Sequence, residues 1–125
     1  HDAARPLVSE KVISRCLEAL KEHHAIVPTI PVSDTIVKIN KDYIESVINR
    51  DSILLNQTPQ CFRFVLIFKA HHQEAQKLKM YDKTDDVSLV LNIGEKVHFV
   101  PGDKLNIKVT TIEDFLLVDH IIKSR

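Results

Sequence analysis

The chain has 125 residues, of which 44% are hydrophobic, and this is enough to build the core of one domain or of part of one. Its 17 basic and 17 acidic residues give a formal net charge of zero, which excludes a broad electrostatic attraction to nucleic acid or to an anionic membrane. The longest apolar runs are far shorter than a membrane span. From the charge and from these short runs together, we expect neither a nucleic-acid partner nor a membrane partner.

The first six residues, His-Asp-Ala-Ala-Arg-Pro, predict the end of a buried strand that turns into a loop, because Pro6 cannot donate to a sheet ladder. The small Ala3 and Ala4 would let a ligand approach the backbone. The carboxylate of Asp2 can bind a hydroxyl group or a metal, and the guanidinium of Arg5 can hold a phosphate through two hydrogen bonds. We therefore expect this segment to lie in the middle of a domain, at the edge of an active site.

A helix over residues 8–23 and a strand over residues 25–32 follow. Apolar residues recur in the helix at spacings of three and four, and Ser9 is a suitable N-terminal cap. The strand is short and rich in β-branched residues, but Pro28 and Pro31 predict that it is irregular or lies at an edge of the sheet.

A β-hairpin that projects from the domain is expected over residues 34–51, where two short β-rich runs flank a turn at 40–42. Beyond it, strands and helices continue to alternate, which predicts an α/β sheet. These later elements are a strand over 52–57, a helix over 62–78, a helix over 87–93 between a cap at 84–86 and Gly94, strands over 96–100 and 105–109, and a last helix capped by Thr110 or Thr111.

The cysteines and glycines narrow the class of protein. Cys16 and Cys61 are far apart in the sequence and lack metal-ligand spacing, so we expect free, buried thiols in a reducing compartment. Gly94 and Gly102 are the only two glycines, so the 125 residues contain no glycine-rich phosphate loop of the Walker or the dinucleotide type.

Four groups of polar residues could carry chemistry, although each also has an ordinary structural explanation as a surface pair, a turn or a helix cap. The adjacent histidines at 23–24 and 71–72 lack an acidic or thiol partner at ligand spacing, so we expect no metal there. The four groups are Asp2 to Arg5, then Asp34-Thr35 with Arg50, then Gln57-Thr58-Pro59-Gln60, and finally Thr84-Asp85-Asp86 with residues 106–111.

Taken in order, these groups form a specific series of motifs: His-Asp-Ala-Ala-Arg-Pro, Pro-Val-Ser-Asp-Thr-Ile, Asn-Arg, Gln-Thr-Pro-Gln, Thr-Asp-Asp-x-Ser-Leu-Val and Asn-Ile-Lys-Val-Thr-Thr-x-Glu-Asp. The series closely resembles the 2-C-methyl-D-erythritol 4-phosphate cytidylyltransferase family over the whole chain. The resemblance implies a Rossmann-like α/β nucleotidyltransferase sheet, present here in part, with a projecting β-arm at about residues 34–51. Residues 1–125 would form the C-terminal part of a single cytidylyltransferase domain.

The resemblance also implies a reaction: transfer of CMP from CTP to methylerythritol phosphate, with release of pyrophosphate and with magnesium (Mg2+) as cofactor. This step belongs to non-mevalonate isoprenoid biosynthesis, and the family resemblance implies a cytoplasmic homodimer joined through the β-arm. The family's glycine-rich loop, which grips the CTP triphosphate, is not among these 125 residues. We therefore expect this chain by itself to be inactive.

Individual roles follow from the same resemblance. Lys108 and Arg50 would be catalytic and would position the attacking phosphate, with Arg50 coming from the arm of the partner subunit. Cations placed there would offset the repulsion between two anions, so that catalysis is mostly positioning and charge stabilisation. Substrate contacts would come from Asp2, Ala3, Arg5, Thr58 and Thr84, and from Thr35 on the partner's arm.

Two alternatives stay open. A ribitol-5-phosphate cytidylyltransferase would act on a different polyol phosphate, although Ala4 and the Ser-Leu-Val run at 88–90 favour the isoprenoid enzyme. A non-catalytic module that dimerises through the β-arm is the second alternative. Asn49, Cys61 and Val87 depart from residues common in the family, but none of them replaces a charged group that the chemistry needs.

Overall fold

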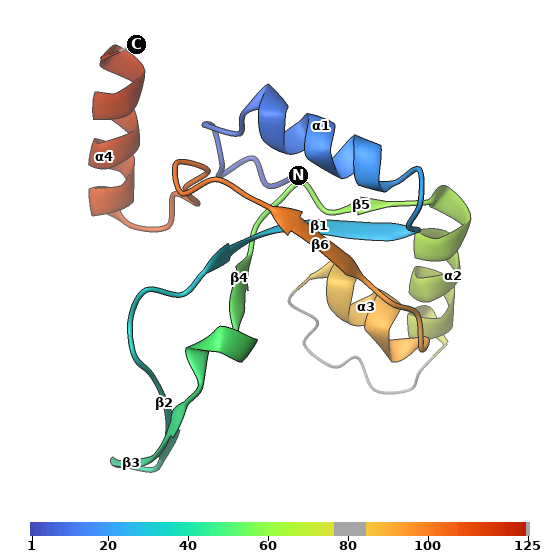
Figure 1. Ribbon diagram of the computed structural model, residues 1–125, viewed down its shortest axis with the longest axis horizontal. Coiled ribbons are helices and arrows are strands. Elements are labelled where there is room, and N and C mark those ends of the chain that lie inside the picture. The colour runs from blue at the N-terminus through green and yellow to red at the C-terminus, as the bar shows by residue number, and fades with distance from the viewer. Residues whose placement is uncertain (77–84, 125) are drawn as a thin grey trace.

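The computed structural model describes residues 1–76 and 85–124, and Figure 1 shows a mixed sheet with helices on both of its faces. This arrangement confirms the expected α/β sheet. At its centre, β1 (Ala25–Pro31) pairs in parallel with β6 (His98–Pro101). The other edge of β1 pairs antiparallel with β4 (Leu54–Asn56) and with β5 (Cys61–Phe62), a short strand that the sequence analysis missed.

Three helices begin at caps that the sequence predicts, whereas the first two α-helices are shorter than the predicted ranges of 8–23 and 62–78. Ser9 and Asp85 each accept a hydrogen bond from a backbone N–H in the first turn of a helix, and Thr111 forms a capping box. Gly94 has a φ of 81°, a left-handed conformation that suits glycine after a helix end. The helical segments are α1 (Glu10–Ala19), η1 (Arg50–Ser52, a single 3-10 turn), α2 (Phe64–Ala75), α3 (Asp86–Asn92) and α4 (Ile112–Lys123).

The core has two parts because successive residues of a strand point to opposite faces of the sheet. Ile26 of β1 packs with Cys16 of α1 on one face. Its neighbour Ala25 packs on the other face with Ala70 of α2 and Val90 of α3. Figure 1 shows α1 and α3 on opposite sides of β1, so the strand is covered on both faces.

The prediction that the strand around Pro28 is irregular or lies at a sheet edge was wrong, because β1 has neighbours along both edges. Pro28 has no N–H to donate, and its carbonyl accepts a hydrogen bond of 2.9 Å from the backbone N–H of Gln57. Its nitrogen therefore faces the gap in the ladder between β4 and β5, where no ladder hydrogen bond is lost.

The predicted strand at residues 105–109 was also wrong, because this segment has no strand structure. Asn106 is fully buried, whereas its apolar neighbour Leu105 is 46% exposed, which reverses the alternation of a half-buried strand. The backbone carbonyl of Asn106 accepts hydrogen bonds from side chains of Arg5 and Gln57 instead of joining a ladder.

The predicted hairpin is confirmed: β2 (Ile36–Asn40) and β3 (Tyr43–Ile48) form a separate two-stranded sheet that projects away from the main sheet (Figure 1). Lys41 in the turn has a φ of 53°. Lys38 Nζ lies 2.6 Å from Glu45 Oε2 and links the two strands on one face of the ribbon.

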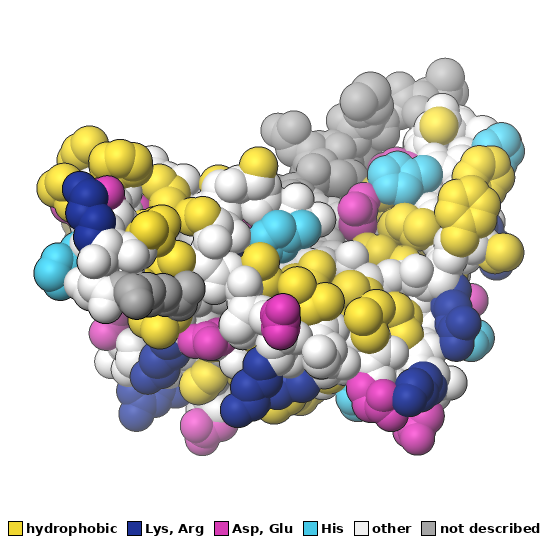
Figure 2. All heavy atoms as spheres, turned by 90° about the horizontal axis from the view of Figure 1, so that it is seen from above, with side chains coloured by type: hydrophobic (Ala, Val, Ile, Leu, Met, Phe, Trp, Pro, Cys, Tyr) yellow, Lys and Arg dark blue, Asp and Glu magenta, His cyan; other side chains and the backbone are white. Residues whose placement is uncertain are grey.

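The apolar face of α4 is largely exposed. Only Val118 of this helix is buried, whereas Phe115 is 54% and Leu116 is 59% exposed. Figure 2 shows hydrophobic side chains gathered at both ends of the molecule, over α4 at the left and over α2 at the right. Within residues 1–76 and 85–124, no helix has both the length and the hydropathy needed to cross a membrane.

Candidate functional site

The first five residues form a turn that brings an acid and a guanidinium to one place. The backbone N–H of Arg5 donates to the carbonyl of Asp2 at 3.1 Å, and Ala3 lies exposed within this turn. The carbonyl of Ala4 accepts a hydrogen bond of 2.8 Å from the N–H of Val109. This last bond fastens the turn to the segment that carries Lys108.

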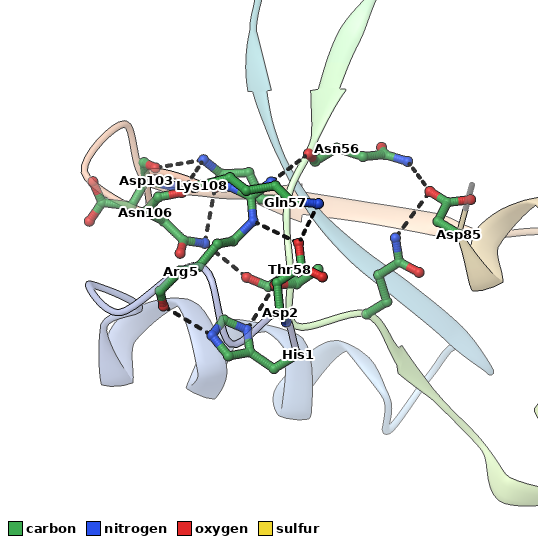
Figure 3. A network of polar contacts seen from close by, with 11 residues as sticks. His1, Asp2, Arg5, Asn56, Gln57, Thr58, Asp85, Asp103, Asn106 and Lys108 are labelled. Atoms are coloured by element: carbon green, nitrogen blue, oxygen red, sulfur yellow. Dashed lines mark hydrogen bonds and ion pairs between the residues drawn. The ribbon is translucent and has the colours of Figure 1, made fainter. Parts of the chain in front are cut away.

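Two cations contact the carboxylate of Asp2 (Figure 3). Asp2 Oδ2 lies 3.2 Å from Lys108 Nζ and 3.5 Å from Arg5 Nε. Burial by itself would raise the pKa of Asp2, but the hydrogen bond and charge of Lys108, followed by the charge and hydrogen bond of Arg5, outweigh it and lower this pKa below 3.8. The cluster therefore joins two cations and one anion at neutral pH, and Lys108 keeps half of its side chain exposed for a ligand.

The terminal nitrogens of Arg5 are already engaged by the protein. One donates to the carbonyl of Asn106 at 2.7 Å, and the other lies 3.4 Å from the carbonyl of Asn56. The side chain is only 11% exposed. In this structure Arg5 therefore links the N-terminal turn to the segments around Asn56 and Asn106, while its charge remains next to Asp2.

The hydroxyl of Thr58 has two neighbours from the N-terminal turn. It accepts a hydrogen bond of 3.1 Å from the N–H of Asp2 and lies 2.8 Å from Nδ1 of His1. The other ring nitrogen of His1 faces the carbonyl of Arg5 at 3.2 Å, and a carbonyl can only accept. In the neutral ring that nitrogen carries the proton, so Thr58 donates to His1 and keeps one lone pair free for a ligand hydroxyl.

A second part of the Gln-Thr-Pro-Gln segment contacts the start of α3. Gln60 Nε2 donates to Asp85 Oδ2 at 3.1 Å, and Asn56 Nδ2 lies 3.5 Å from the same oxygen. Asp85 also caps α3 through Oδ1, which accepts from the N–H of Ser88 at 3.1 Å. The prediction that the Thr-Asp-Asp motif caps a helix is thus confirmed for Asp85. The same residue also joins α3 to the site (Figure 3).

Known proteins match this chain along nearly its whole length. The sequence model of the 2-C-methyl-D-erythritol 4-phosphate cytidylyltransferase family matches residues 1–124. The chain belongs to this family. A protein of that name from Geobacillus kaustophilus is 44% identical over 125 residues, which cover 100% of this chain and 54% of that protein. A protein of that name from Clostridium beijerinckii is 38% identical, with coverage of 99% and 54%.

Solved structures of this cytidylyltransferase family share the fold. The crystal structure of 2-C-methyl-D-erythritol 4-phosphate cytidylyltransferase from Thermus thermophilus matches with a TM-score of 0.88 at 34% identity, and covers 98% of this chain and 60% of that one. The 4-diphosphocytidyl-2C-methyl-D-erythritol synthase from Anaerococcus prevotii matches with a TM-score of 0.87 at 32% identity, with coverage of 98% and 57%. The Rossmann-like nucleotidyltransferase fold is therefore shown, and the chain spans about half the length of the curated relatives it matches.

The structure brings together some of the residues that the cytidylyltransferase resemblance singled out, but not all of them. Arg50 lies at the base of the hairpin, where it donates to the carbonyl of Ser33 at 2.7 Å, and Thr35 is exposed at the start of the same hairpin. Thr84 lies outside the described residues. The residues that meet around the N-terminal turn are Asp2, Ala3, Arg5, Thr58 and Lys108.

Three further residues of the site belong to the predicted motifs but had been given no individual role: His1, Gln57 and Asn106. Gln57 and Asn106 are buried, whereas His1 is exposed and contacts Thr58 (Figure 3). A usable signal was present, because each of the three lies one or two residues from a predicted site residue.

Within the described part of the chain, no three histidine, cysteine, aspartate or glutamate side chains gather in a way that could hold a metal ion.

Proposed function

We propose that this chain supplies the polyol-phosphate half of a cytidylyltransferase, which transfers CMP from CTP to 2-C-methyl-D-erythritol 4-phosphate and releases pyrophosphate. The observation that carries the proposal is the meeting of Lys108 and Arg5 on one carboxylate, Asp2, beside the hydroxyl of Thr58. Two cations suit a phosphate, and a carboxylate with a hydroxyl suits the alcohol groups of a polyol.

The proposed mechanism is mainly electrostatic. A phosphate oxygen of the polyol phosphate attacks the α-phosphorus of CTP, and the bond from that phosphorus to the pyrophosphate oxygen breaks. Two anions must approach for this to happen, so a positioned cation lowers the barrier. Lys108, with its half-exposed side chain, would hold the attacking phosphate, and Arg50 would supply a second cation from the partner subunit.

The acidic groups around this cluster do not fit a resident magnesium ion. Mg2+ takes oxygen ligands in octahedral geometry, and Asp2 Oδ2 already contacts both Lys108 and Arg5. We therefore place Mg2+ with the triphosphate of CTP and not among the residues of this cluster.

The hairpin supports a homodimer. A two-stranded ribbon is at best marginally stable alone, and this one exposes Ile39, Tyr43, Ile44 and Val47, each by more than 65%. We propose that the hairpin packs on a second copy and delivers Arg50 and Thr35 to the other subunit's substrate. We propose a cytoplasmic location for the enzyme, in keeping with its free thiols.

The activity can be tested in a chimera that joins this chain to the part of the Geobacillus kaustophilus relative that the chain does not span. We expect CTP-dependent release of pyrophosphate with methylerythritol phosphate, and much slower release with ribitol 5-phosphate. Lys108→Met should abolish turnover, whereas Lys104→Met, which changes an exposed lysine of the same segment, should not. Equal rates with the two polyol phosphates, or an active Lys108→Met variant, would contradict the proposal. The 125-residue chain alone should not turn over.

Subunit mixing tests the arm. If Arg50 acts across the dimer, a heterodimer of Arg50→Met and Lys108→Met subunits contains one intact site. An equal mixture of the two inactive variants should therefore recover about a quarter of the unsubstituted activity, as two-fold symmetry dictates. No recovery, in a mixture shown by mass spectrometry to contain heterodimers, would place Arg50 in its own subunit's site. Activity that survives Arg50→Met would instead favour the non-catalytic dimerisation module.

A further inference from the structure

Beneath the charged cluster lie two buried amides. Gln57, just after β4, is 4% exposed, and Asn106, in the segment after β6, is 0% exposed. Both side chains occupy the space between these two segments (Figure 3). Burying an amide is unfavourable unless its polar atoms are paired. Among the side-chain polar atoms of these two residues, Oδ1 of Asn106 has no hydrogen-bond partner within the described residues, and the contacts of the other three indicate what the amides hold together.

Gln57 pairs with the backbone of Asp103 in the manner of a strand. Its Nε2 donates to the carbonyl of Asp103 at 2.8 Å, and its Oε1 accepts from the N–H of Asp103 at 3.1 Å. Nε2 also lies 3.4 Å from the carbonyl of Asn106. One side chain thus anchors both ends of the turn at 103–106 to the end of β4.

Asn106 connects the segment after β6 back to Thr58, Gln57 and Arg5. Its Nδ2 donates to the carbonyl of Thr58 at 2.8 Å and lies 3.5 Å from Oε1 of Gln57, while its own carbonyl accepts from Arg5 at 2.7 Å. The chain around Asn106 is therefore tied to two of the residues that form the cluster. We call the paired side chains of Gln57 and Asn106 the amide clamp.

The clamp matters for Lys108 because residues 105–109 are not held by a sheet. The backbone bond from Val109 to Ala4 and the bond from Arg5 to the carbonyl of Asn106 join this segment to the N-terminal turn, and the amide clamp fixes its other side to the end of β4. Gly102 shows how closely the clamp is packed, since a Cβ at that position would lie 2.3 Å from Oε1 of Gln57.

We propose that Gln57 and Asn106 are positioning residues for the nucleotidyl transfer: they fix the backbone that carries Lys108, so that its ammonium group faces Asp2 and the attacking phosphate. The functional part of this inference rests on the proposed function. Neither amide would touch the substrate, and each would act only through Lys108 and its neighbours Thr58 and Arg5.

The geometric part can be tested by NMR titration of the Asp2 carboxyl in the 125-residue chain, without any substrate. Lys108→Met removes the main cation, so the pKa of Asp2 should rise. Gln57→Met, which keeps the size of the side chain but loses the amide, should raise it in the same direction, and the double variant should resemble Lys108→Met alone. Thr29→Val, which changes a buried polar residue outside the clamp, should leave the pKa of Asp2 unchanged.

Asn106→Ala provides a second variant with the same expected pattern if Gln57→Met does not fold. Additive effects of Gln57→Met and Lys108→Met on Asp2 would overturn the proposal, because the clamp would then act independently of Lys108. Loss of the folded spectrum in both clamp variants would also overturn it, since the amides would then support the domain as a whole.

The catalytic part is tested in the chimera described above. Gln57→Met should lower kcat/KM for methylerythritol phosphate by about tenfold or more, while the KM for CTP changes by less than about twofold. A loss confined to the KM for CTP would overturn the proposed role. The two experiments can fail separately. If the unsubstituted chimera does not turn over, but Gln57→Met and Lys108→Met still have non-additive effects on the pKa of Asp2, the proposed function is contradicted. The positioning of Lys108 by the clamp then still stands.

Discussion

Asp2 Oδ2 lies 3.2 Å from Lys108 Nζ, although the two residues come from nearly opposite ends of the chain. A backbone hydrogen bond between Ala4 and Val109 joins the same two segments. The ion pair therefore joins the first turn of the chain to the segment that precedes α4. It also leaves the cluster with one positive charge in excess, because Arg5 contacts the same carboxylate.

Acid should weaken the contacts of the cluster. Burial alone would raise the pKa of Asp2, but Lys108 and Arg5 lower it below 3.8. A carboxyl group whose pKa is lowered by folding contributes stability that is present above its unfolded pKa and is lost as the pH falls through its folded pKa. Because Asp2 is about one-third exposed, we expect a contribution below about 1 kcal/mol, measured by urea unfolding from pH 6 down to pH 3.

In that experiment Asp2→Asn should remove the pH-dependent contribution. Asp119→Asn is the matched control, since Asp119 pairs with Lys123 at 2.7 Å on the exposed surface of α4. An equal loss in both variants would contradict a special role for the Asp2 contacts.

The two thiols should react slowly. Burial, together with the neighbouring Cys61, raises the pKa of Cys16 to about 12, and burial also raises the pKa of Cys61. The thiolate is the reactive form, so iodoacetamide at about pH 8 should modify the unfolded chain far faster than the folded one. Peptide mass spectrometry after timed quenching measures both sites, and rapid modification of Cys16 in the folded protein would contradict the packing of α1 on β1.

The start of α4 depends on one hydroxyl. Thr111 accepts a hydrogen bond from the N–H of Asp114, whose carboxylate accepts in return from the N–H of Thr111. Thr111→Ala should weaken the first turns of α4 by about 1 kcal/mol, whereas Thr111→Ser keeps the hydroxyl and should be nearly neutral. Hydrogen exchange of the α4 amides is the appropriate measurement, because much of this helix is exposed. Equal exchange rates in the two variants would contradict the prediction.

The two glycines should respond differently to substitution. A Cβ on Gly102 would lie 2.3 Å from Oε1 of Gln57 and 3.1 Å from the carbonyl of Thr29, so Gly102→Ala should cost about 1–3 kcal/mol through forced repacking. Gly94 has open space but a φ of 81°, so Gly94→Ala should cost about 1 kcal/mol through backbone strain.

Asparagine separates these two causes in unfolding measurements, because it tolerates a left-handed φ better than alanine does. Gly94→Asn should therefore recover much of the loss seen in Gly94→Ala. Gly102→Asn, which is larger than Gly102→Ala, should recover none, and any recovery at that position would contradict the close contact with Gln57.

Features that depend on neighbouring residues could be predicted from the sequence. The caps at Ser9 and Thr111 and the end of α3 at Gly94 follow from side-chain reach and backbone preference within a few residues. The central position of β1 could not be predicted, because it requires knowing that the neighbouring chain breaks its ladder opposite Pro28.

The segment at 105–109 was mispredicted for the same reason, because remote residues decide its structure. Its β-branched residues favour a strand, and what they compete with is remote in the sequence: Arg5 and Gln57 take the carbonyl of Asn106. The proximity of Cys16 and Cys61 is likewise a tertiary result, since α1 packs on the face of the sheet that Cys61 of β5 shares with Ile26 of β1.

By itself the sequence determined most of the element types, the hairpin and the ordered series of polar motifs that matches one cytidylyltransferase family. Only the tertiary structure decided that Asp2, Thr58 and Lys108 meet, and that two buried amides hold them in register. The physical reason is range: helix caps and turns form within a few residues, whereas these contacts join residues that are 46 or more positions apart and exist only once the sheet around β1 has assembled.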